Sequence, residues 1–501
     1  MKIAFRTDAT SQIGTGHFMR CITLAEKLKK HGVQIRFVSR DLPVHLREML
    51  AAKGMAYAPL SSEPSAVVGG DLAHAQWLGT SQAEDAQATI QALSGQQWDW
   101  IVIDHYALDV RWEKALRAST KKIMVIDDIA DRQHDCDVLL DQNFYADMYM
   151  RYEGKVPVHC QQMLGPHYAL LRDEFRKLRE QAKPRTGSVK RILVFFGGVD
   201  AANYCGLAIE AFAGLALNGV QLDVVIGAQH PKRSAIEASC VTQGYFCHVQ
   251  TTQMAALMAR ADLVIGAGGI ATWERCCLGL PAFSFCVADN QRKQIVDAAE
   301  AGLLYAPSSD SALMDMIRRH TKTLLENPSL LKLISTAGMK AVDGKGTTRI
   351  CHALGVYDIE IRPANESDSQ KLFKWRNHPS IRAVSRNNTP IAWEEHQRWF
   401  CSVLADKNRD LLIGTIENES VGVVRFDKEG DVAEVSIYLV PDGGFAGQGR
   451  NLLLRAEQWL KANRPEITAI RAGVLGENEA SNNLFLGTNY CTHTIIYLKN
   501  L

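Results

Sequence analysis

A histidine follows a glycine turn close to the start of the chain. In the stretch FRTDATSQIGTGHFMRC, Gly14 and Gly16 stand between an apolar run and a helical pattern, and His17 comes next. Backbone N–H groups at the start of such a helix bind phosphate, and a neutral imidazole beside them can take a proton from water near neutral pH. A lone histidine at a helix start is more often structural, so its chemistry depends on what other elements bring to the same place.

A strongly apolar run supplies polar residues that would share a cleft with His17. The run WIVIDHY ends in Asp104, His105 and Tyr106, and the carboxyl ends of parallel strands line the ligand cleft of Rossmann-like folds. We therefore expect these three residues to contact a substrate. Packing of the strand end against the next helix explains His105 and Tyr106 equally well.

Two glycine turns later in the chain are typical of phosphate binding. Gly197-Gly198 follows one apolar run, and Gly268-Gly269 follows another, with Thr272 and Glu274 in the next helical pattern. Glu274 is expected one and a half turns into that helix, where a carboxylate can accept both hydroxyls of a ribose while the helix N-terminus binds a diphosphate. The turns, Thr272 and Glu274 are predicted substrate contacts.

Acidic residues near these motifs have simpler explanations than metal binding. Asp8 could orient His17 through its second ring nitrogen, but a turn residue that caps its own backbone is at least as good an interpretation. Acidic side chains that follow strands are usually solvated, and a metal needs converging oxygens in a defined geometry. We therefore expect no metal at the four carboxylates that follow strands, Asp127, Asp128, Asp135 and Asp137.

A third glycine turn lies near the end of the chain. A strand predicted over Glu434 to Val440 leads to Gly447-Gln448-Gly449, which opens an amphipathic helix. The free N–H groups of this turn suit a pyrophosphate. Asn478 and Ser481 begin another helical pattern, where helix capping alone would explain both residues.

Composition restricts the class of protein. The chain has 501 residues, of which 47% are hydrophobic and 22% charged, and its net charge is +1. It lacks the strongly basic balance of nucleic-acid binders. The 12 cysteines contain no CxxC pair, which suits reduced thiols. We find no secretory signal and no apolar run long enough to span a membrane, so a cytoplasmic protein is expected.

The order of the predicted elements indicates three domains. Short apolar runs alternate with helical patterns over roughly the first 350 residues, which predicts parallel sheets covered on both faces. A charged segment with Pro184 and Gly187 divides this part, so we expect Rossmann-like domains at 1–180 and 181–355. Hairpin-like runs then predict an α+β domain at 356–501.

The N-terminal motifs resemble known enzymes. GAGGIATWERCCLGLPAFSF resembles the donor-nucleotide motif of the two-domain (GT-B) glycosyltransferases that make bacterial lipid II, and FRTDATSQIGTGHFMRC, IDHYALD and LGPHYALLRDEF resemble the UDP-sugar hydrolases of pseudaminic acid biosynthesis. This resemblance implies that His17 activates water for inverting attack on the anomeric carbon of UDP-2,4-diacetamido-2,4,6-trideoxy-β-L-altropyranose, with release of UDP. It also implies sugar contacts at Asn290 and Gln291.

The C-terminal motifs resemble the GNAT acetyltransferases. That resemblance implies an acetyl-CoA site formed by Leu439, Val440, Gly447, Gly449, Arg450, Asn478 and Ser481. Two positions depart from the family pattern. Gly444 replaces the usual Arg or Gln of the turn motif, and Phe485 replaces a tyrosine proposed to protonate the leaving thiolate. Tyr490 lies nearby in the sequence and is a candidate for that role.

The stretch LFKWRNHPSIRAVSRNNTPIAWEEHQRWF resembles the acetyltransferase that acts one step before the hydrolase, on the 4-amino group of a UDP-altrosamine derivative. It implies acceptor contacts at Trp375, Arg376, Asn377, Arg382 and His396. Arginines suit a diphosphate, whereas Trp375 could equally be a core aromatic. Glu434 is the predicted base, with Ser436 on the same face of its strand.

The two resemblances concern consecutive reactions, so we predict a bifunctional enzyme of pseudaminic acid biosynthesis. Acetyl-CoA is the expected cosubstrate, UDP-activated amino sugars are the expected partners, and no tightly bound cofactor is implied. Two alternatives stay open. One is a UDP-sugar-dependent glycosyltransferase fused to an acetyltransferase, and the other is a non-catalytic nucleotide-sugar-binding protein. A base at His17 favours catalysis over binding alone.

Overall fold

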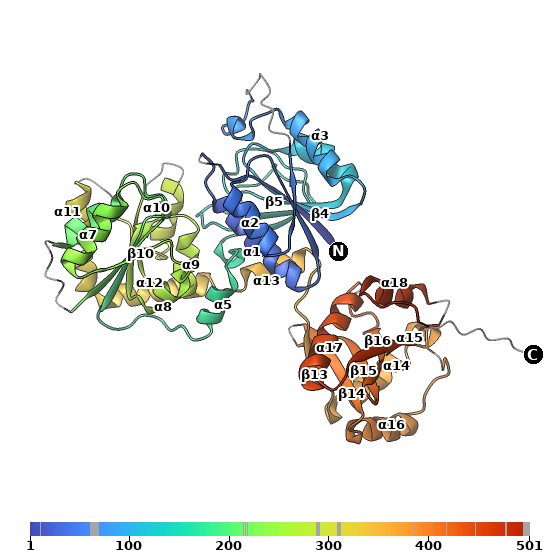
Figure 1. The fold of residues 1–501 in the computed structure, drawn as a ribbon. Helices are drawn as coiled ribbons and strands as arrows, with labels where there is room; N and C mark the ends of the chain where they lie inside the picture. Colours follow the sequence, from blue (N-terminus) through green and yellow to red (C-terminus); the bar gives the residue numbers. More distant parts are fainter. Residues whose placement is uncertain are drawn as a thin grey trace, which may run out of the picture. The chain divides into compact units, whose positions relative to one another are not determined.

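The protein is described by a computed structural model. It covers residues 1–10, 12–60, 70–213, 215, 217, 219–286, 291–307, 312–385, 387–416, 418–445, 447–475 and 478–493. These residues form two compact units, 1–354 and 355–501, which are coloured blue to yellow and orange to red in Figure 1. In the described part of the chain, no helix is long and apolar enough to cross a bilayer.

The first sheet of the N-terminal unit is parallel and has the order β3-β2-β1-β4-β5-β6-β7. Its strands are β1 (Lys2–Thr7), β2 (Gln34–Ser39), β3 (Ala56–Pro59), β4 (Trp98–Asp104), β5 (Thr120–Ile126), β6 (Val138–Asp141) and β7 (Gln161–Leu164). The order around β1 is that of a Rossmann fold, in which β1 and β4 are neighbours and a ligand cleft opens at their carboxyl ends. The register pairs Thr7 with Asp104, so the turn after β1 lies beside the end of β4.

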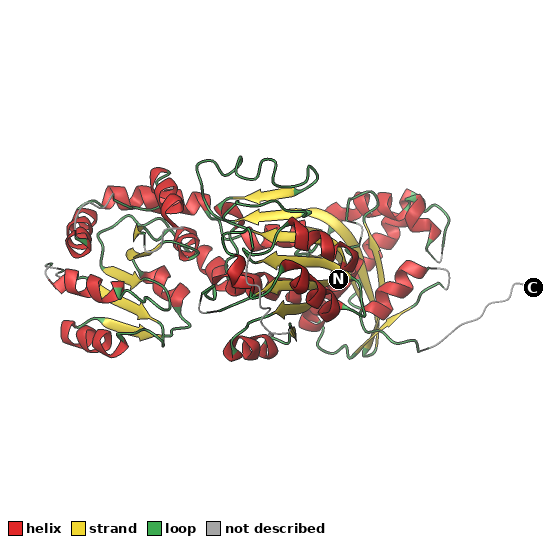
Figure 2. Ribbon diagram, turned by 90° about the horizontal axis from the view of Figure 1, so that it is seen from above, coloured by secondary structure: helices red, strands yellow, loops and turns green. Residues whose placement is uncertain are grey.

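Helices cover both faces of this sheet, as the predicted alternation requires. The helical elements are α1 (Gly16–Lys30), α2 (Val44–Ala52), η1 (Ala75–Leu78), α3 (Gln82–Leu93), α4 (Val110–Leu116), η2 (Arg117–Ser119) and η3 (Pro166–Tyr168). On one face Phe18 of α1 packs 5.6 Å from Phe37 of β2, between ring centroids. On the other, α3 and α4 share a hydrophobic core with Ile101 and Ile103 of β4. Figure 2 shows the strands enclosed by helices.

The second sheet repeats the same topology. It is parallel, with the order β10-β9-β8-β11-β12, and comprises β8 (Arg191–Phe195), β9 (Gln221–Ile226), β10 (Phe246–Val249), β11 (Leu263–Ala267) and β12 (Ala282–Phe285). The helices of this part are α5 (Asp173–Arg179), α6 (Tyr204–Ala213), α7 (Arg233–Gln243), α8 (Met254–Arg260), α9 (Ala271–Cys277), α10 (Arg292–Glu300), α11 (Leu313–Leu325) and α12 (Pro328–Ala341). The last helix, α13 (Gly346–Ala353), returns to α1 and η3 of the first sheet. The unit is therefore a pair of Rossmann-like sheets.

Buried contacts join the two sheets. The amide oxygen of Asn143, just after β6, accepts hydrogen bonds from Trp273 Nε1 of α9 at 3.0 Å and from Gln294 Nε2 of α10 at 2.9 Å. At the end of the unit, the chain returns to the first sheet, because Trp100 Nε1 of β4 donates to the carbonyl oxygen of Leu354 at 3.1 Å. The two sheets are thus joined by buried hydrogen bonds at Asn143.

The C-terminal unit is an α+β domain with one mixed sheet in the order β13-β14-β15-β16-β17. Its strands are β13 (Glu360–Pro363), β14 (Arg409–Ile416), β15 (Glu419–Glu429), β16 (Val432–Leu439) and β17 (Ala469–Ala472), and its helical elements are η5 (Glu366–Asp368), α14 (Ser369–Arg376), α15 (Pro379–Ala383), α16 (Trp393–Ala405), α17 (Gly449–Asn463) and α18 (Glu479–Gly487). The pairings from β13 to β16 are antiparallel, as expected from the polar turns, and β16–β17 is parallel.

The two parallel strands of this sheet separate along their length. Pairing of β16 with β17 ends at Val435 and Ala472, although β16 continues to Leu439 and stays paired with β15. The last residues of β16 therefore have a strand on one side only. An opening forms between them and the segment that follows β17.

Candidate active sites

His17 is held by a carboxylate at the carboxyl edge of the first sheet. It lies in the first turn of α1 and is 9% exposed. Its Nδ1 is 2.5 Å from Oδ1 of Asp104, the fully buried last residue of β4. Burial alone would raise the pKa of Asp104, but Arg20 and His17 outweigh it, and this pKa lies well below its usual range.

An ionised Asp104 determines which nitrogen of His17 carries the proton. A carboxylate can only accept, so Nδ1 is the donor and Nε2 of the neutral ring keeps its lone pair. Arg20 Nη2 also lies 3.2 Å from Nδ1, but two donors cannot bond to each other. The guanidinium instead donates to both oxygens of Asp104, from Nε at 2.6 Å and Nη2 at 2.7 Å.

Tyr106 forms the next wall of this site. Its ring meets the His17 ring edge-on at 4.6 Å between centroids, and its hydroxyl donates to Asp128, which also binds Arg20 at 2.8 Å. Sequence reasoning missed two further rings that extend this wall, Trp77 of η1 and His74 before it, at 5.6 and 5.4 Å from Tyr106. No motif identified in the sequence includes either residue.

Asp8 does not orient His17, which is a correction to one expectation. It forms an ion pair with Arg6 Nη1 at 2.7 Å and lies 3.3 Å from His105 Nε2, and it accepts hydrogen bonds from Ser39 Oγ and the backbone N–H of Arg40. His105 is buried, and its Nδ1 accepts from the backbone N–H of Ala107. This favours the packing interpretation of His105 over a substrate contact.

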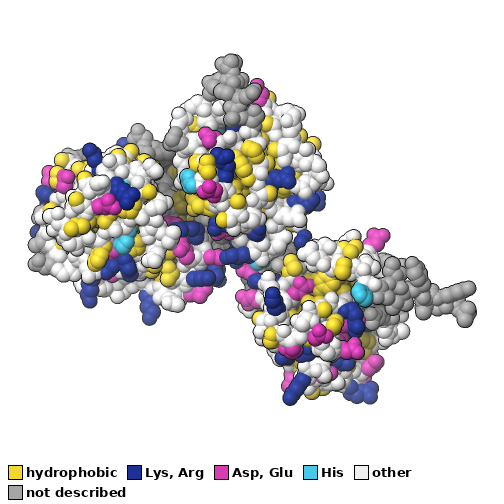
Figure 3. All heavy atoms as spheres, viewed as in Figure 1, with side chains coloured by type: hydrophobic (Ala, Val, Ile, Leu, Met, Phe, Trp, Pro, Cys, Tyr) yellow, Lys and Arg dark blue, Asp and Glu magenta, His cyan; other side chains and the backbone are white. Residues whose placement is uncertain are grey.

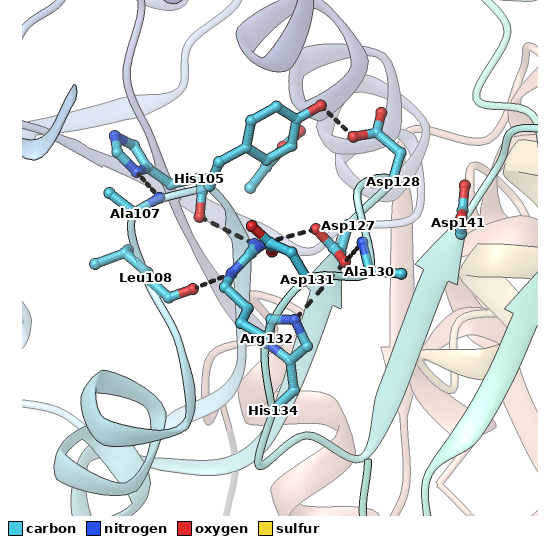
Figure 4. A network of polar contacts seen from close by, with 12 residues as sticks. His105, Ala107, Leu108, Asp127, Asp128, Ala130, Asp131, Arg132, His134 and Asp141 are labelled. Carbon is cyan, nitrogen blue, oxygen red and sulfur yellow. Dashed lines mark hydrogen bonds and ion pairs between the residues drawn. The ribbon is translucent and has the colours of Figure 1, made fainter. Parts of the chain in front are cut away.

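The aspartates that follow strands in this sheet are paired with cations. Asp127 lies 3.0 Å from Arg132 Nη1 and 3.8 Å from His134 Nε2, and Arg132 also donates to the backbone carbonyl of Leu108, as Figure 4 shows. Arg117 binds Asp135 and Asp137 at 2.9 and 2.7 Å. These side chains were expected to be solvated, but the structure holds them in ion pairs.

The second sheet presents a glycine turn to the turn that precedes His17. A Cβ atom added at Gly16 would lie 3.8 Å from Cδ1 of Ile270, the residue after Gly268-Gly269. Gly14 and Gly269 have φ values of 74° and 94°, which favour glycine. Two of the predicted phosphate-type turns, one from each sheet, thus lie next to each other.

Gln291 lies against this second turn. Its amide atoms are 3.6 Å from the Cβ positions of Gly268 and Gly269, and its buried Oε1 has no hydrogen-bond partner among the described residues. The other predicted sugar contact of this loop, Asn290, lies outside the described residues.

Glu274 is placed slightly earlier in its helix than expected. It is in the first turn of α9, with Thr272 buried beside it. Arg172 Nη2 lies 3.3 Å from its Oε1; burial raises the pKa of Glu274, and Arg172 opposes this shift. Gly197-Gly198, the other predicted turn, has φ of 99° at Gly197 and open space in front of both Cβ positions in the described structure.

The C-terminal unit contains a cavity of about 480 Å³ where β16 and β17 separate. Of the residues predicted for this unit, six line it: Arg376, His396, Glu434, Ser436, Asn478 and Ser481. Glu434 and Ser436 are two residues apart on β16, so both lie on the same face of the strand, and both line the cavity. Glu434 also lies 3.2 Å from Arg471 Nη2 of β17.

Only some of the predicted acceptor contacts line the cavity. Arg376 lines the cavity, and it donates to the Asn387 carbonyl at 2.9 Å. His396 lines it too, although it is buried among aromatic rings with Nε2 2.9 Å from the Ser369 carbonyl. The remaining three do not line it: Trp375 packs on the core, Asn377 bonds to the backbone of Ile391, and Arg382 donates to the Asn388 carbonyl.

The predicted pyrophosphate turn opens α17. Gly447 has φ of 83°, and Gly449 is the first residue of the helix. Arg450 follows, with its Nε buried and without a hydrogen-bond partner among described residues. Leu439 is the last residue of β16, and the backbone N–H of Val440, which follows it, donates to the Val421 carbonyl. Asn478 caps α18 through the N–H of Ser481, so helix capping explains at least one of its interactions.

Tyr438 and Arg425 are among the cavity-lining residues that were not predicted. Tyr438 continues the face of β16 that carries Glu434 and Ser436, because side chains alternate along a strand. That alternation was a signal in the sequence. Arg425 pairs with Ser436 in the register of β15 and β16, a signal that needs the strand pairing to be known.

Comparisons with known proteins identify the family of the C-terminal unit. Residues 358–486 match the family described as "Acetyltransferase (GNAT) domain", so the C-terminal unit is a GNAT domain. The chain is 29% identical over 85 residues, 17% of its length, to a Campylobacter jejuni protein named "Acetyltransferase PseH" and covers 54% of that protein.

A second relative from Campylobacter jejuni is named "UDP-2,4-diacetamido-2,4,6-trideoxy-beta-L-altropyranose hydrolase". It is 30% identical over 204 residues, which is 40% of this chain and 62% of the relative. The matched length exceeds that of the C-terminal unit, so the similarity extends into residues 1–354. Acinetobacter baumannii MurG has a TM-score of 0.47 and 15% identity, covering 70% of this chain and 98% of its own.

Proposed function

We propose that the chain is a bifunctional enzyme of pseudaminic acid biosynthesis. Its GNAT domain transfers an acetyl group from acetyl-CoA to the 4-amino group of UDP-4-amino-4,6-dideoxy-N-acetyl-β-L-altrosamine. The N-terminal unit then hydrolyses UDP-2,4-diacetamido-2,4,6-trideoxy-β-L-altropyranose to UDP and the free sugar. The observation that carries the hydrolase assignment is the His17–Asp104 pair, which sets up a base where the two sheets face each other.

In the hydrolysis, His17 activates the water. Its Nε2 accepts a proton as the water oxygen attacks the anomeric carbon, while the bond from that carbon to the UDP oxygen breaks on the opposite side. The configuration inverts, and the protonated ring is stabilised by ionised Asp104. Because Arg20 binds both oxygens of Asp104, the carboxylate keeps its orientation during the transfer.

The second sheet would hold the leaving UDP. The N–H groups around Gly268-Gly269 and the start of α9 can neutralise the diphosphate, and Glu274 can accept the ribose hydroxyls. Gln291 Oε1, which has no partner among described residues, is a suitable acceptor for a sugar hydroxyl or amide N–H. Tyr106 provides an aromatic ring beside the base, and Trp77 and His74 extend this ring surface.

In the acetyl transfer, Glu434 removes a proton from the ammonium group of the acceptor, and the amine attacks the thioester. Acetyl-CoA would enter where β16 and β17 separate, with its pyrophosphate on the turn before α17. Arg376 is the arginine of the predicted acceptor set that lines the cavity, and its planar guanidinium suits the acceptor diphosphate.

A phosphorus NMR time course tests both reactions together. The full chain is given the 4-amino UDP-sugar, with and without acetyl-CoA, and with no other acceptor. We expect UDP to appear only when acetyl-CoA is present, and a His17→Ala variant to accumulate the acetylated UDP-sugar instead. Acetylation without any UDP release by the wild-type chain would favour a glycosyltransferase or a binding protein over the hydrolase.

A further inference from the structure

Acetyl transfer leaves a thiolate that needs a proton. Neither Phe485, which stands where related enzymes carry a tyrosine, nor the candidate Tyr490 can supply it. Phe485 lines the cavity but has no hydroxyl. The hydroxyl of Tyr490 donates to Glu457 Oε1 at 2.8 Å, and its ring packs on Phe485 at 5.0 Å between centroids. Tyr490 does not line the cavity. Another acid is therefore required.

Tyr438 is the tyrosine among the described residues that lines this cavity. It lies on the same face of β16 as Ser436 and Glu434, two and four residues away. Its ring packs on the cluster that includes Phe400 and Leu411, whereas its hydroxyl forms no hydrogen bond with any described residue. Burial raises the pKa of Tyr438, and Arg376 and Arg425 partly oppose this, so the phenol stays protonated at neutral pH.

The separation of the strands gives Tyr438 access to the thioester. Pairing between β16 and β17 stops at Val435, three residues before Tyr438. Beyond that point Gly473, Val474 and Leu475 line the other side of the same cavity. The phenol therefore faces the opening into which the acyl end of acetyl-CoA would project.

We infer that Tyr438 is the general acid that protonates the leaving thiolate of CoA, in the place of the aromatic hydroxyl that Phe485 lacks. This inference rests on the proposed acetyl transfer. Tyr438 thus completes a set on one strand face, in which Glu434 takes a proton at the start of the reaction and Tyr438 gives one at its end.

The proton balance closes without any further reactant. Glu434 takes one proton from the ammonium group and later loses it to water. The amine nitrogen then bonds to the thioester carbon, the carbon–sulfur bond breaks, and sulfur takes the proton of the Tyr438 hydroxyl. The new amide nitrogen sheds its extra proton, which returns to the tyrosinate. The products are the N-acetyl sugar, CoA thiol and one proton.

The test uses the Tyr438→Phe variant of the full chain, assayed for CoA thiol release with the 4-amino UDP-sugar. We expect kcat to fall by roughly 10²-fold or more, the range for general acid catalysis, with little change in either KM. Tyr490→Phe is the matched control and should keep the wild-type kcat. Release of UDP from the already acetylated UDP-sugar should be unchanged in both variants, which shows that the chain is folded.

A second donor separates proton donation from a structural role. Acetyl-seleno-CoA, in which selenium replaces the thioester sulfur, releases a selenolate that is a weaker base and needs no acid. We expect the ratio of wild-type to Tyr438→Phe kcat to collapse toward one with this donor. An undiminished ratio, or a Tyr438→Phe variant as fast as wild type with acetyl-CoA, would overturn the inference. Absence of acetylation by the wild-type chain would instead defeat the proposed function.

Discussion

His17 and Asp104 lie far apart in the sequence, yet Nδ1 of the histidine is 2.5 Å from the buried carboxylate. The contact exists because β1 and β4 are neighbours in the first sheet and Thr7 is in register with Asp104. In the proposed hydrolysis, the carboxylate fixes the tautomer and leaves Nε2 to act as the base. Replacing either residue alone should therefore slow the release of UDP to a similar extent.

Asp104→Asn should slow UDP release from the acetylated UDP-sugar by roughly 10²-fold or more, with little change in KM, because the amide no longer fixes the tautomer or stabilises the protonated ring. Steady-state kinetics on the full chain measures this. Because general base catalysis contributes about 10²–10⁴-fold, His17→Ala should fall within the same range. An Asp104→Asn variant with the wild-type kcat would contradict the role of the pair.

Asp8→Asn should affect stability rather than catalysis, in contrast to Asp104→Asn. Asp8 is buried between Arg6 and His105 and does not contact His17. Breaking this buried ion pair should destabilise the unit by about 3–5 kcal/mol, whereas the folded fraction should release UDP at the wild-type kcat. Urea unfolding gives the first quantity, and active-site titration with rate measurement at low temperature gives the second. A catalytic defect without lost stability would return Asp8 to the active site.

Glu274→Gln should weaken UDP binding by roughly 10-fold or more, since hydrogen bonds to a charged group contribute about 1.5–3 kcal/mol. Calorimetric titration of the full chain with UDP measures the change. Glu174→Gln is the matched control, because Glu174 contacts the same residue, Arg172, at 2.6 Å. If both variants bind UDP equally well, Glu274 serves only the ion pair with Arg172.

His134 makes the stability of the N-terminal unit depend on pH. Burial lowers its pKa, but Asp127 and Glu113 outweigh this and raise the pKa to about 9. The ordinary value is near 6.5, so the stabilisation is fully present below about pH 6.5 and is lost as pH rises through 9. In His134→Gln, the loss of stability should be on the order of 3 kcal/mol at pH 6.

That loss should shrink toward pH 10, where wild-type His134 is neutral as well. Denaturant unfolding at several pH values follows the trend. His45→Gln, at an exposed position of α2, should change stability by less than about 0.5 kcal/mol at every pH. A His134→Gln penalty that is independent of pH would mean that His134 is neutral in the folded chain.

The fold was largely predictable because its elements are marked locally. Apolar runs ended by Gly14, Gly197 and Gly268 indicated strands followed by phosphate-type turns, and polar Gly and Asn turns indicated the antiparallel part. The β16–β17 pair is parallel, and the order of the runs gave no sign of where these two strands separate. That separation depends on long-range pairing.

The sequence indicated many of the residues that form the sites, but not which of these residues contact each other. Asp104 was expected to touch a substrate, and it binds His17 and Arg20. Asp8, which was offered as a possible partner of His17 beside a capping role, pairs with Arg6 instead. One signal could have corrected this: in a Rossmann order the first strand lies beside the fourth, so an aspartate that ends the fourth is next to the first turn. No comparable signal led to Trp77.

Charges of both signs are interspersed on the molecular face in Figure 3, in keeping with the net charge of +1. At this net charge we expect no strong long-range steering of an anionic UDP-sugar toward this face, because steering requires a surface field of one sign. The anion must be recognised inside the clefts, by N–H groups and arginines. Turnover should depend only weakly on salt.

The peptide bond between Leu354 and Gly355 is anchored on both sides. Trp100 binds the carbonyl of Leu354 at 3.1 Å within one unit, and Gln448 binds the carbonyl of Gly355 at 2.9 Å within the other. Splitting the gene between these two codons would leave both hydrogen bonds intact and would encode the two units as separate proteins. Kept joined, one round of translation delivers both in a one-to-one ratio, which no change in promoter strength can unbalance.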